Sequence, residues 1–286
     1  ILEVVEERNF LFTQKLSSFH ESKAVGIEAD NLTISEYKLL KDNTRVNFRE
    51  TIGLIESLRL IKDNNEIILI KKAVEITDRT FENIRKHLKE GLSEKLVSRK
   101  IIEHMDDFGA DGVSFSPIVA NGSASAFPHY QTGKTPIKKG ILLIDAGAKF
   151  KGNNGDLTRT YHIGKPDNKF IERYKLLLEV QLKILDFVKP GLSEEEVWQK
   201  SVKLLGNEAK HFVHGLGHGI GIEVHEAPNL RKGRKLKLKP GMTITIEPGI
   251  YYPGWGGIRI EDYILVTKDG CEVLSKTPKD LKSIII

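Results

Sequence analysis

The chain has 286 residues, with 44 lysines and arginines against 39 aspartates and glutamates and a formal net charge of +5. Basic residues are mixed with acidic ones along the chain, so the composition does not indicate a nucleic-acid partner. The single cysteine, Cys271, excludes an intramolecular disulfide, and no apolar run reaches the roughly 20 residues of a membrane span. We therefore expect a cytoplasmic protein without a signal peptide or membrane anchor.

The first 60 residues alternate short apolar runs with polar patches. Ala24 to Ile27 predicts a strand that leads through Asp30 and Asn31 into a helix. The chain begins with Ile1 and not with methionine, which suggests that the native N-terminus was trimmed or is missing. We predict a partial, small α/β domain over residues 1–60.

After Arg59 the pattern changes to a long amphipathic helix, from about Asn65 to Lys89, and a second one is predicted from Phe170 to Val188. Each helix is followed by the same Gly-Leu-Ser-Glu turn, at 91–94 and at 191–194, and by another helix. The recurrence indicates either two related halves about a pseudo-twofold axis or two independent uses of a common capping turn.

In the sequence, predicted strands follow each of the two helical pairs. Residues 140–150 and 157–164 read as a hairpin around the turn at 152–155, and residues 242–252 and 257–267 form a second pair. We predict one α+β catalytic domain over residues 61–286, with helices covering a curved, mostly antiparallel sheet.

Asp145 follows the apolar run from Ile141 to Ile144 and is expected at the end of a buried strand. A buried carboxylate needs a charged partner, and no lysine or arginine stands near Asp145 in the sequence. Asp156 lies across the predicted hairpin, so both aspartates can reach one metal ion. Either residue alone would suit an ordinary turn or strand end.

Three histidines, His214, His218 and His225, lie in a segment with four glycines from Gly215 to Gly221. The glycines disfavour a regular helix and are expected to let the backbone pass close to a ligand. We assign one of these histidines to metal and the others to substrate. Together with Glu247 and Glu261, the aspartates and one imidazole form an oxygen-rich set that favours manganese, cobalt or iron.

Two such ions can share a hydroxide nucleophile and polarise a carbonyl, so hydrolysis is the expected reaction. The sequence has no GxSxG, GxxxxGK[ST] or strand-linked GxGxxG motif for a competing chemistry.

The stretches 145–160, 214–228, 243–254 and 257–267 resemble the pita-bread metallopeptidases of the prolidase and Xaa-Pro aminopeptidase group. The resemblance covers the chain from about residue 52 to its end. It implies the pita-bread fold with pseudo-twofold halves, and hydrolysis of the Xaa-Pro bond of dipeptides or short peptides by a hydroxide that bridges two divalent ions. Manganese or cobalt is the implied metal, and a homodimer is possible.

The resemblance also implies a role for each motif residue. Asp145 would bind one ion, Asp156 and Glu261 would bridge both, and His218 and Glu247 would complete the other, with Glu247 shuttling the proton. The residues that would contact substrate or support the site are His129, His214, His225 and Arg259.

One departure from the family pattern leaves the substrate length open. Prolidases often carry an arginine just after the HExP stretch to bind the dipeptide carboxylate, but this chain has Asn229 there, with Arg231 two residues later. Dipeptidase and aminopeptidase thus stay alternatives. Two further alternatives are a catalytically silent peptide- or protein-binding member of the same fold and a methionine aminopeptidase.

Overall fold

The structure is a computed structural model that describes residues 24–286. The chain divides into two compact units between Leu58 and Arg59. In the first, the predicted strand and helix are present: β1 pairs in parallel with β2, and Thr33 caps the helix α2 in a capping box with Glu36. The part of the predicted N-terminal domain before Ala24 lies outside the described residues. The elements of this unit are β1 (Ala24–Glu28), α2 (Ile34–Asn43), β2 (Asn47–Thr51) and α3 (Leu54–Arg59).

The helices of the second unit follow the predicted order and, within about two residues, the predicted bounds. Asp63 caps the first of them, and its buried face carries Ile70, Val74 and Phe81 at helical spacing. Asp167 caps the second long helix. The helices are α4 (Asn64–His87), α5 (Glu94–Asp107), α6 (Asn168–Phe187) and α7 (Glu194–Leu205), with short 3₁₀ helices η1 (Gly122–Ala126) and η2 (Gly206–His211).

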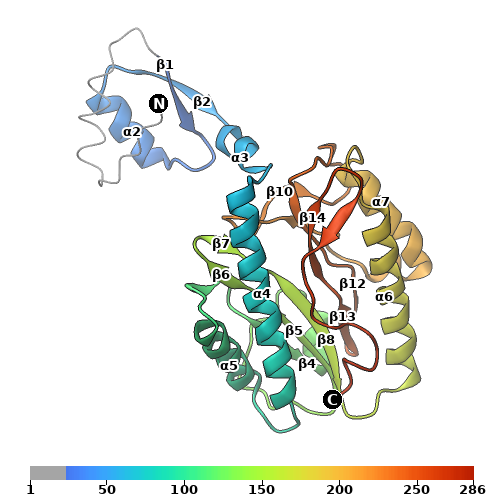
Figure 1. Ribbon diagram of the computed structural model, residues 1–286. Helices are drawn as coiled ribbons and strands as arrows, with labels where there is room; N and C mark the ends of the chain where they lie inside the picture. The colour runs from blue at the N-terminus through green and yellow to red at the C-terminus, as the bar shows by residue number, and fades with distance from the viewer. Residues whose placement is uncertain (1–23) are drawn as a thin grey trace. The chain divides into compact units, whose positions relative to one another are not determined.

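The two helical pairs are related structurally as well as in sequence. Gly91 and Gly191 both adopt positive φ, 91° and 89°, and Ser93 and Ser193 each accept a hydrogen bond from the backbone three residues on. Helix α4 packs against β6 and β7, whereas α6 packs against β11 and β13 (Figure 1). The repeated turn therefore marks two halves with the same arrangement, as the pseudo-twofold interpretation predicted.

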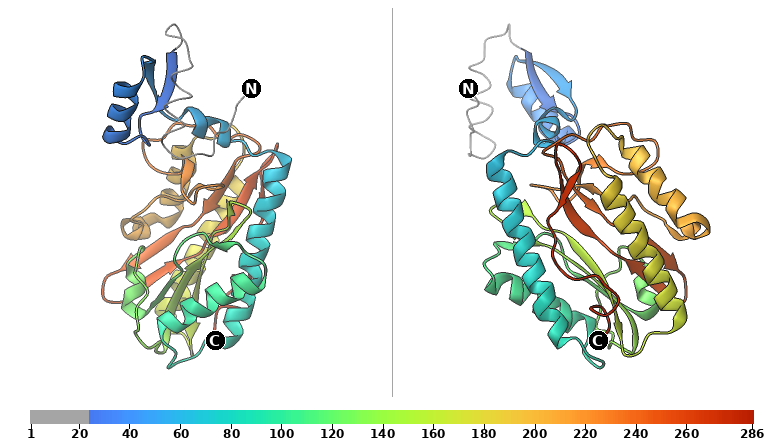
Figure 2. Two further views of the ribbon diagram at one scale, coloured as in Figure 1. Left: turned by 90° about the vertical axis from the view of Figure 1, so that its left-hand side faces the viewer. Right: turned by 45° about the vertical axis from the view of Figure 1, so that its right-hand side comes forward.

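All strand pairs described in the second unit are antiparallel. One sheet has the order β4-β5-β8 and another the order β10-β9-β11-β14-β15, with β3-β6-β7 and β12-β13 beside them. Helices α4 and α6 run along these strands (Figure 2). The strands are β3 (Gly112–Val113), β4 (Ile118–Asn121), β5 (Gly140–Ala146), β6 (Ala148–Phe150), β7 (Asn153–Asn154), β8 (Leu157–Ile163), β9 (His218–Gly219), β10 (Glu226–Asn229), β11 (Thr243–Ile246), β12 (Gly249–Tyr252), β13 (Gly256–Arg259), β14 (Asp262–Val266) and β15 (Cys271–Val273).

Each predicted hairpin is present but is broken into two ladders. The first break lies at Gly147 and Gly155, where a Cβ on Gly147 would stand 1.8 Å from the carbonyl oxygen of Gly155. The second lies at Pro248, which has no N–H to donate to a ladder. These breaks stand beside Asp156 and Glu247, so the side chains that follow a ladder can leave it and turn into a shared space.

Apolar side chains on the inner faces of strands and helices form the main core of this unit. Leu142, Ile144, Ile246 and Ile258 are each fully buried. Among the helices of the described part of the chain, none is long and apolar enough to span a membrane.

Candidate metal centre

All five side chains that the sequence predicted as metal ligands line one cavity of about 900 Å³. They come from separate parts of the sheets: Asp145 lies in β5 and His218 in β9, whereas Asp156 directly precedes β8, Glu247 directly follows β11, and Glu261 lies between β13 and β14. The two aspartates share an antiparallel pair in which Asp145 lies opposite Thr158. The predicted set thus converges although its members are up to 116 residues apart, from Asp145 to Glu261.

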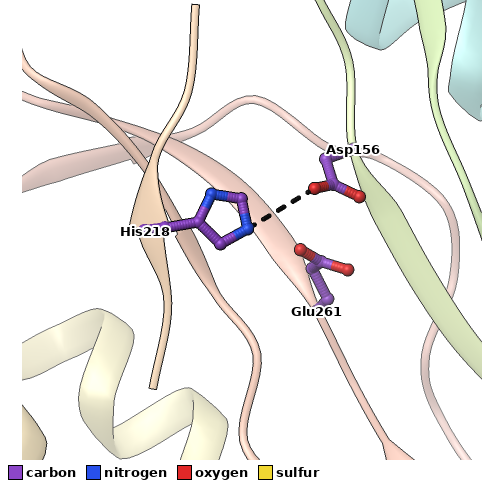
Figure 3. Close-up of side chains that lie close together, drawn as sticks. All are labelled: Asp156, His218 and Glu261. Atoms are coloured by element: carbon purple, nitrogen blue, oxygen red, sulfur yellow. Dashed lines mark ion pairs between the residues drawn. The ribbon is translucent and has the colours of Figure 1, made fainter. Parts of the chain in front are cut away.

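Asp156, His218 and Glu261 form the tightest group (Figure 3). One ligand atom from each lies within 4.8 Å of the others, and all three side chains are buried. In Figure 3 they point toward one another from three segments that are far apart in the sequence. This spacing allows all three to contact one metal ion.

His218 presents a lone pair to two carboxylates. Its Nδ1 lies 3.0 Å from the carbonyl oxygen of Gly219, so Nδ1 carries the proton and donates it there. Burial and the neighbouring His225 lower the pKa of His218 to about 4, so the ring is neutral at pH 7. Its unprotonated Nε2 lies 3.6 Å from an oxygen of Asp156 and 3.6 Å from an oxygen of Glu247. Three electron-rich atoms facing one another repel unless a cation lies between them.

The carboxylates are held close together away from water. Burial, then the charges of neighbouring carboxylates, raises the pKa values of Asp156 and Glu261 well above the ordinary range. Burial raises the pKa of Glu247 to about 7. One oxygen each of Asp145 and Asp156 is buried without a hydrogen-bond partner. These residues therefore fit divalent cations, which would neutralise the charge and occupy the unpartnered oxygens.

Arg259 is buried and donates three hydrogen bonds within the site. Its Nη2 lies 2.6 Å from Asp145, its Nε 3.0 Å from the hydroxyl of Thr158, and its Nη1 2.8 Å from the hydroxyl of Tyr251. The hydroxyl of Thr158 donates in turn to Glu261 at 2.6 Å. The guanidinium therefore orients Asp145 directly and Glu261 through Thr158.

The three predicted substrate histidines also line the cavity. Both nitrogens of His214 are engaged: Nδ1 donates to the carbonyl of Gly215 at 2.6 Å, and Nε2 accepts from Tyr251 at 2.8 Å. Burial, then Arg259, lowers the pKa of His214 to about 3, so its ring is neutral. His225 lies with its ring centroid 4.3 Å from that of His218, and His129 is exposed at the cavity wall.

Comparisons with known proteins agree with this geometry. Residues 68–268 match the model of metallopeptidase family M24. The chain belongs to family M24. It is 36% identical to an Xaa-Pro dipeptidase of Pyrococcus furiosus, an alignment covering 98% of this chain and 83% of the relative. The structure also matches an Xaa-Pro dipeptidase from Bacillus anthracis (TM-score 0.90, 42% identity, 92% of this chain and 75% of that one) and an X-Pro aminopeptidase from Thermotoga maritima (TM-score 0.90, 29% identity, 99% and 81%).

The predicted resemblance to the prolidase and Xaa-Pro aminopeptidase group and the pita-bread fold are confirmed. As an M24 chain, the protein is a metallopeptidase of the divalent-metal type.

The glycines around His218 allow close packing of backbone segments, and two of them, Gly215 and Gly217, also line the cavity. The irregular backbone that the sequence predicted is present, and Gly217 and Gly219 have other backbone segments as close neighbours. A Cβ on Gly217 would lie 1.9 Å from the carbonyl oxygen of Thr245, and one on Gly219 would lie 2.0 Å from that of Ala227. The glycines thus bring β9 close to its neighbours and place His218 at the centre.

Sequence reasoning missed two polar groups of this M24 site. Tyr251 connects His214 to Arg259, and Thr158 connects Arg259 to Glu261. Thr158 had a signal, since it stands two residues after Asp156 at the start of a strand, on the same side of the chain. For Tyr251 the only signal in the sequence was its position in the motif that follows Glu247.

Proposed function

We propose that this protein hydrolyses the Xaa-Pro bond of dipeptides or short peptides and that it does so with two divalent cations, manganese or cobalt. The observation that carries the proposal is the neutral His218, whose lone pair faces oxygens of Asp156 and Glu247 at 3.6 Å each. The names of the relatives, dipeptidases and an aminopeptidase for X-Pro substrates, supply the bond. We assign catalysis to residues 61–286, which contain every residue of the site.

We propose Asp145 for one cation, Asp156 and Glu261 as bridges, and His218 with Glu247 for the other. Two cations held there would supply hydroxide as the nucleophile and polarise the scissile carbonyl. Glu247 would transfer a proton to the leaving amine, since its carboxylate lines the cavity next to His218.

The remaining cavity residues would bind the peptide. His129 and His225 have side chains on the cavity wall and are free to donate hydrogen bonds to the oxyanion or to the proline side of the substrate. A contact from His214 would replace one of its bonds, to Gly215 or to Tyr251.

Substrate length depends on the outer part of the cavity. Its volume of about 900 Å³ is near the upper end of the usual range for small-ligand pockets, about 300–1,000 Å³. Asn229 and Arg231 both line it. We propose that the enzyme accepts tripeptides as well as dipeptides, because the position of the carboxylate-binding arginine of dipeptidases is taken by the neutral Asn229.

The test is hydrolysis of Leu-Pro and Leu-Pro-Pro by metal-free protein reloaded with manganese or cobalt, with an Asp156→Asn variant as control. Cleavage of both peptides supports the proposal, and cleavage of Leu-Pro alone would restrict the enzyme to dipeptides. Cleavage of Met-Ala in preference to Met-Pro would favour a methionine aminopeptidase. Equal inactivity of wild type and variant would favour a silent binding protein.

A further inference from the structure

The repeated Gly-Leu-Ser-Glu turn places a glutamate at the first position of a helix in each half. These residues, Glu94 of α5 and Glu194 of α7, are 0% and 3% exposed. A glutamate at this position is common because it interacts favourably with the helix N-terminus, but such residues are normally solvated. Burial of both carboxylates therefore needs a further reason.

Glu94 binds the segment that carries His129. One of its carboxylate oxygens accepts from the backbone N–H of Asn121 at 2.9 Å, and the other accepts from the hydroxyl of Tyr130 at 2.9 Å. Asn121 ends β4, the strand that pairs with β5 and lies opposite Asp145 at Ile118. Tyr130 follows His129 directly and lines the cavity.

Glu194 binds the corresponding segment of the other half, which follows His225. One oxygen accepts from the backbone N–H of Asn229 at 2.6 Å and the other from the backbone N–H of Leu236 at 2.9 Å. Asn229 belongs to β10 and pairs with His218. In both halves the carboxylate thus connects a strand, paired to a strand that carries a predicted metal ligand, with a second segment, and one of its two partners, Tyr130 or Asn229, lines the cavity.

The turns do not need these carboxylates for their own formation. Backbone bonds already join each turn to a neighbouring extended segment, from Gly91 to Ile137 at 2.9 Å and from Gly191 to Leu238 at 2.9 Å, and serines cap both helices. Within residues 24–286 neither glutamate forms an ion pair; the carboxylates of both accept hydrogen bonds from N–H and O–H donors of distant segments.

We propose that Glu94 and Glu194 are pseudo-symmetric positioning residues, which hold the two cavity loops so that His129 and His225 face the peptide bound at the metal centre. The proposal rests on the proposed function for the identity of that peptide. It gives the repeated turn a role in the site: each half of the fold fixes one substrate-binding histidine from its own helix N-terminus.

Hydrogen-bond chemistry predicts that glutamine will replace one of these glutamates and not the other. In Glu94→Gln the new amide can donate to the oxygen of Tyr130, because a hydroxyl can accept as well as donate. In Glu194→Gln the amide NH₂ faces a backbone N–H whichever way it is oriented, and one buried donor loses its partner. We expect kcat/KM for Leu-Pro within about twofold of wild type for Glu94→Gln and a loss of about tenfold for both Glu194→Gln and Glu94→Ala.

A double-mutant cycle separates positioning from loss of stability. If Glu94 acts through His129, Glu94→Ala lowers kcat/KM about tenfold in the wild-type background but less than about twofold when His129 is already alanine. Glu194→Gln should behave in the same way with His225→Ala. The melting temperature should fall equally in both backgrounds. Glu196→Ala is the matched control, since this exposed cap residue of α7 binds Ser193 and Lys237 and should lower stability without changing kcat/KM.

Amide hydrogen exchange gives a readout that does not depend on activity. Glu94→Ala should accelerate exchange over residues 128–132 and not over 225–230, and Glu194→Gln should do the reverse. Equal losses of kcat/KM in both backgrounds of the cycle, or unchanged exchange in both segments, would overturn the inference. If wild type cleaves no Xaa-Pro peptide while the exchange pattern appears as expected, the proposed function is wrong and the holding of the loops stands.

Discussion

The hydroxyl of Tyr251 is the group whose removal tests the site most directly. It lies between Arg259 and His214, accepting from the first and donating to the second at 2.8 Å each. The residue is 3% exposed, so its hydroxyl is shielded from bulk water. Tyr251→Phe removes this one atom and leaves the ring in place.

The structure gives the expected size of the effect. Arg259 loses one of its bonds and keeps those to Asp145 and Thr158, so metal content should not change. A buried N–H without a partner costs about 1–3 kcal/mol. A loss of about 2 kcal/mol lowers the melting temperature of a unit of this size by roughly 4–8 °C. Because His214 also loses the bond that orients its ring, kcat/KM should fall about 10- to 100-fold.

The assay compares Tyr251→Phe with Tyr252→Phe, using Leu-Pro hydrolysis, metal content and thermal unfolding. Tyr252 is the neighbouring residue, and its hydroxyl bonds to Glu208 outside the cavity. The control should keep wild-type kcat/KM. If the two variants lose activity equally, or if Tyr251→Phe keeps both activity and stability, the hydrogen-bond chain from Arg259 to His214 is not important for the site.

Three more predictions follow from the described residues. In metal-free protein, the free energy of unfolding of wild type relative to Glu247→Gln should fall by about 3 kcal/mol as the pH rises from 4.5 to about 7. The reason is that Glu247 releases its proton near pH 4.5 in the unfolded chain and only near pH 7 in the folded chain. Urea unfolding at several pH values tests this, and a difference between the two proteins that stays constant with pH would contradict it. Manganese at about 100 times its Kd should stabilise wild type by about 2.7 kcal/mol and Asp156→Asn by much less, measured by thermal unfolding; equal shifts would argue against a ligand role. Burial raises the pKa of Cys271 to about 11, so iodoacetamide at pH 8 should react about 100-fold more slowly with native than with unfolded protein; similar rates would show that the thiol is not shielded.

Much of the fold follows from local chemistry that the sequence carries. The capping aspartates and serines and the glycines with positive φ stand within a few residues of the helix ends that they determine. Short-range rules of this kind need no knowledge of distant segments. The broken hairpins could not be predicted in the same way, because the break at Gly147 depends on how closely its backbone approaches Gly155.

The sequence alone predicted five ligand residues, because their motifs have a fixed order and spacing, and the structure brings all five to one cavity. Only the tertiary structure decided how these side chains act on one another. The tautomer of His218 depends on the carbonyl of Gly219 and the oxygens of two distant strands. The bonds of Glu94 and Glu194 join helix termini to segments 27 to 42 residues away. Hydrogen bonding and burial act over a few ångströms in space, and separations of that size between distant residues are set by the packed fold.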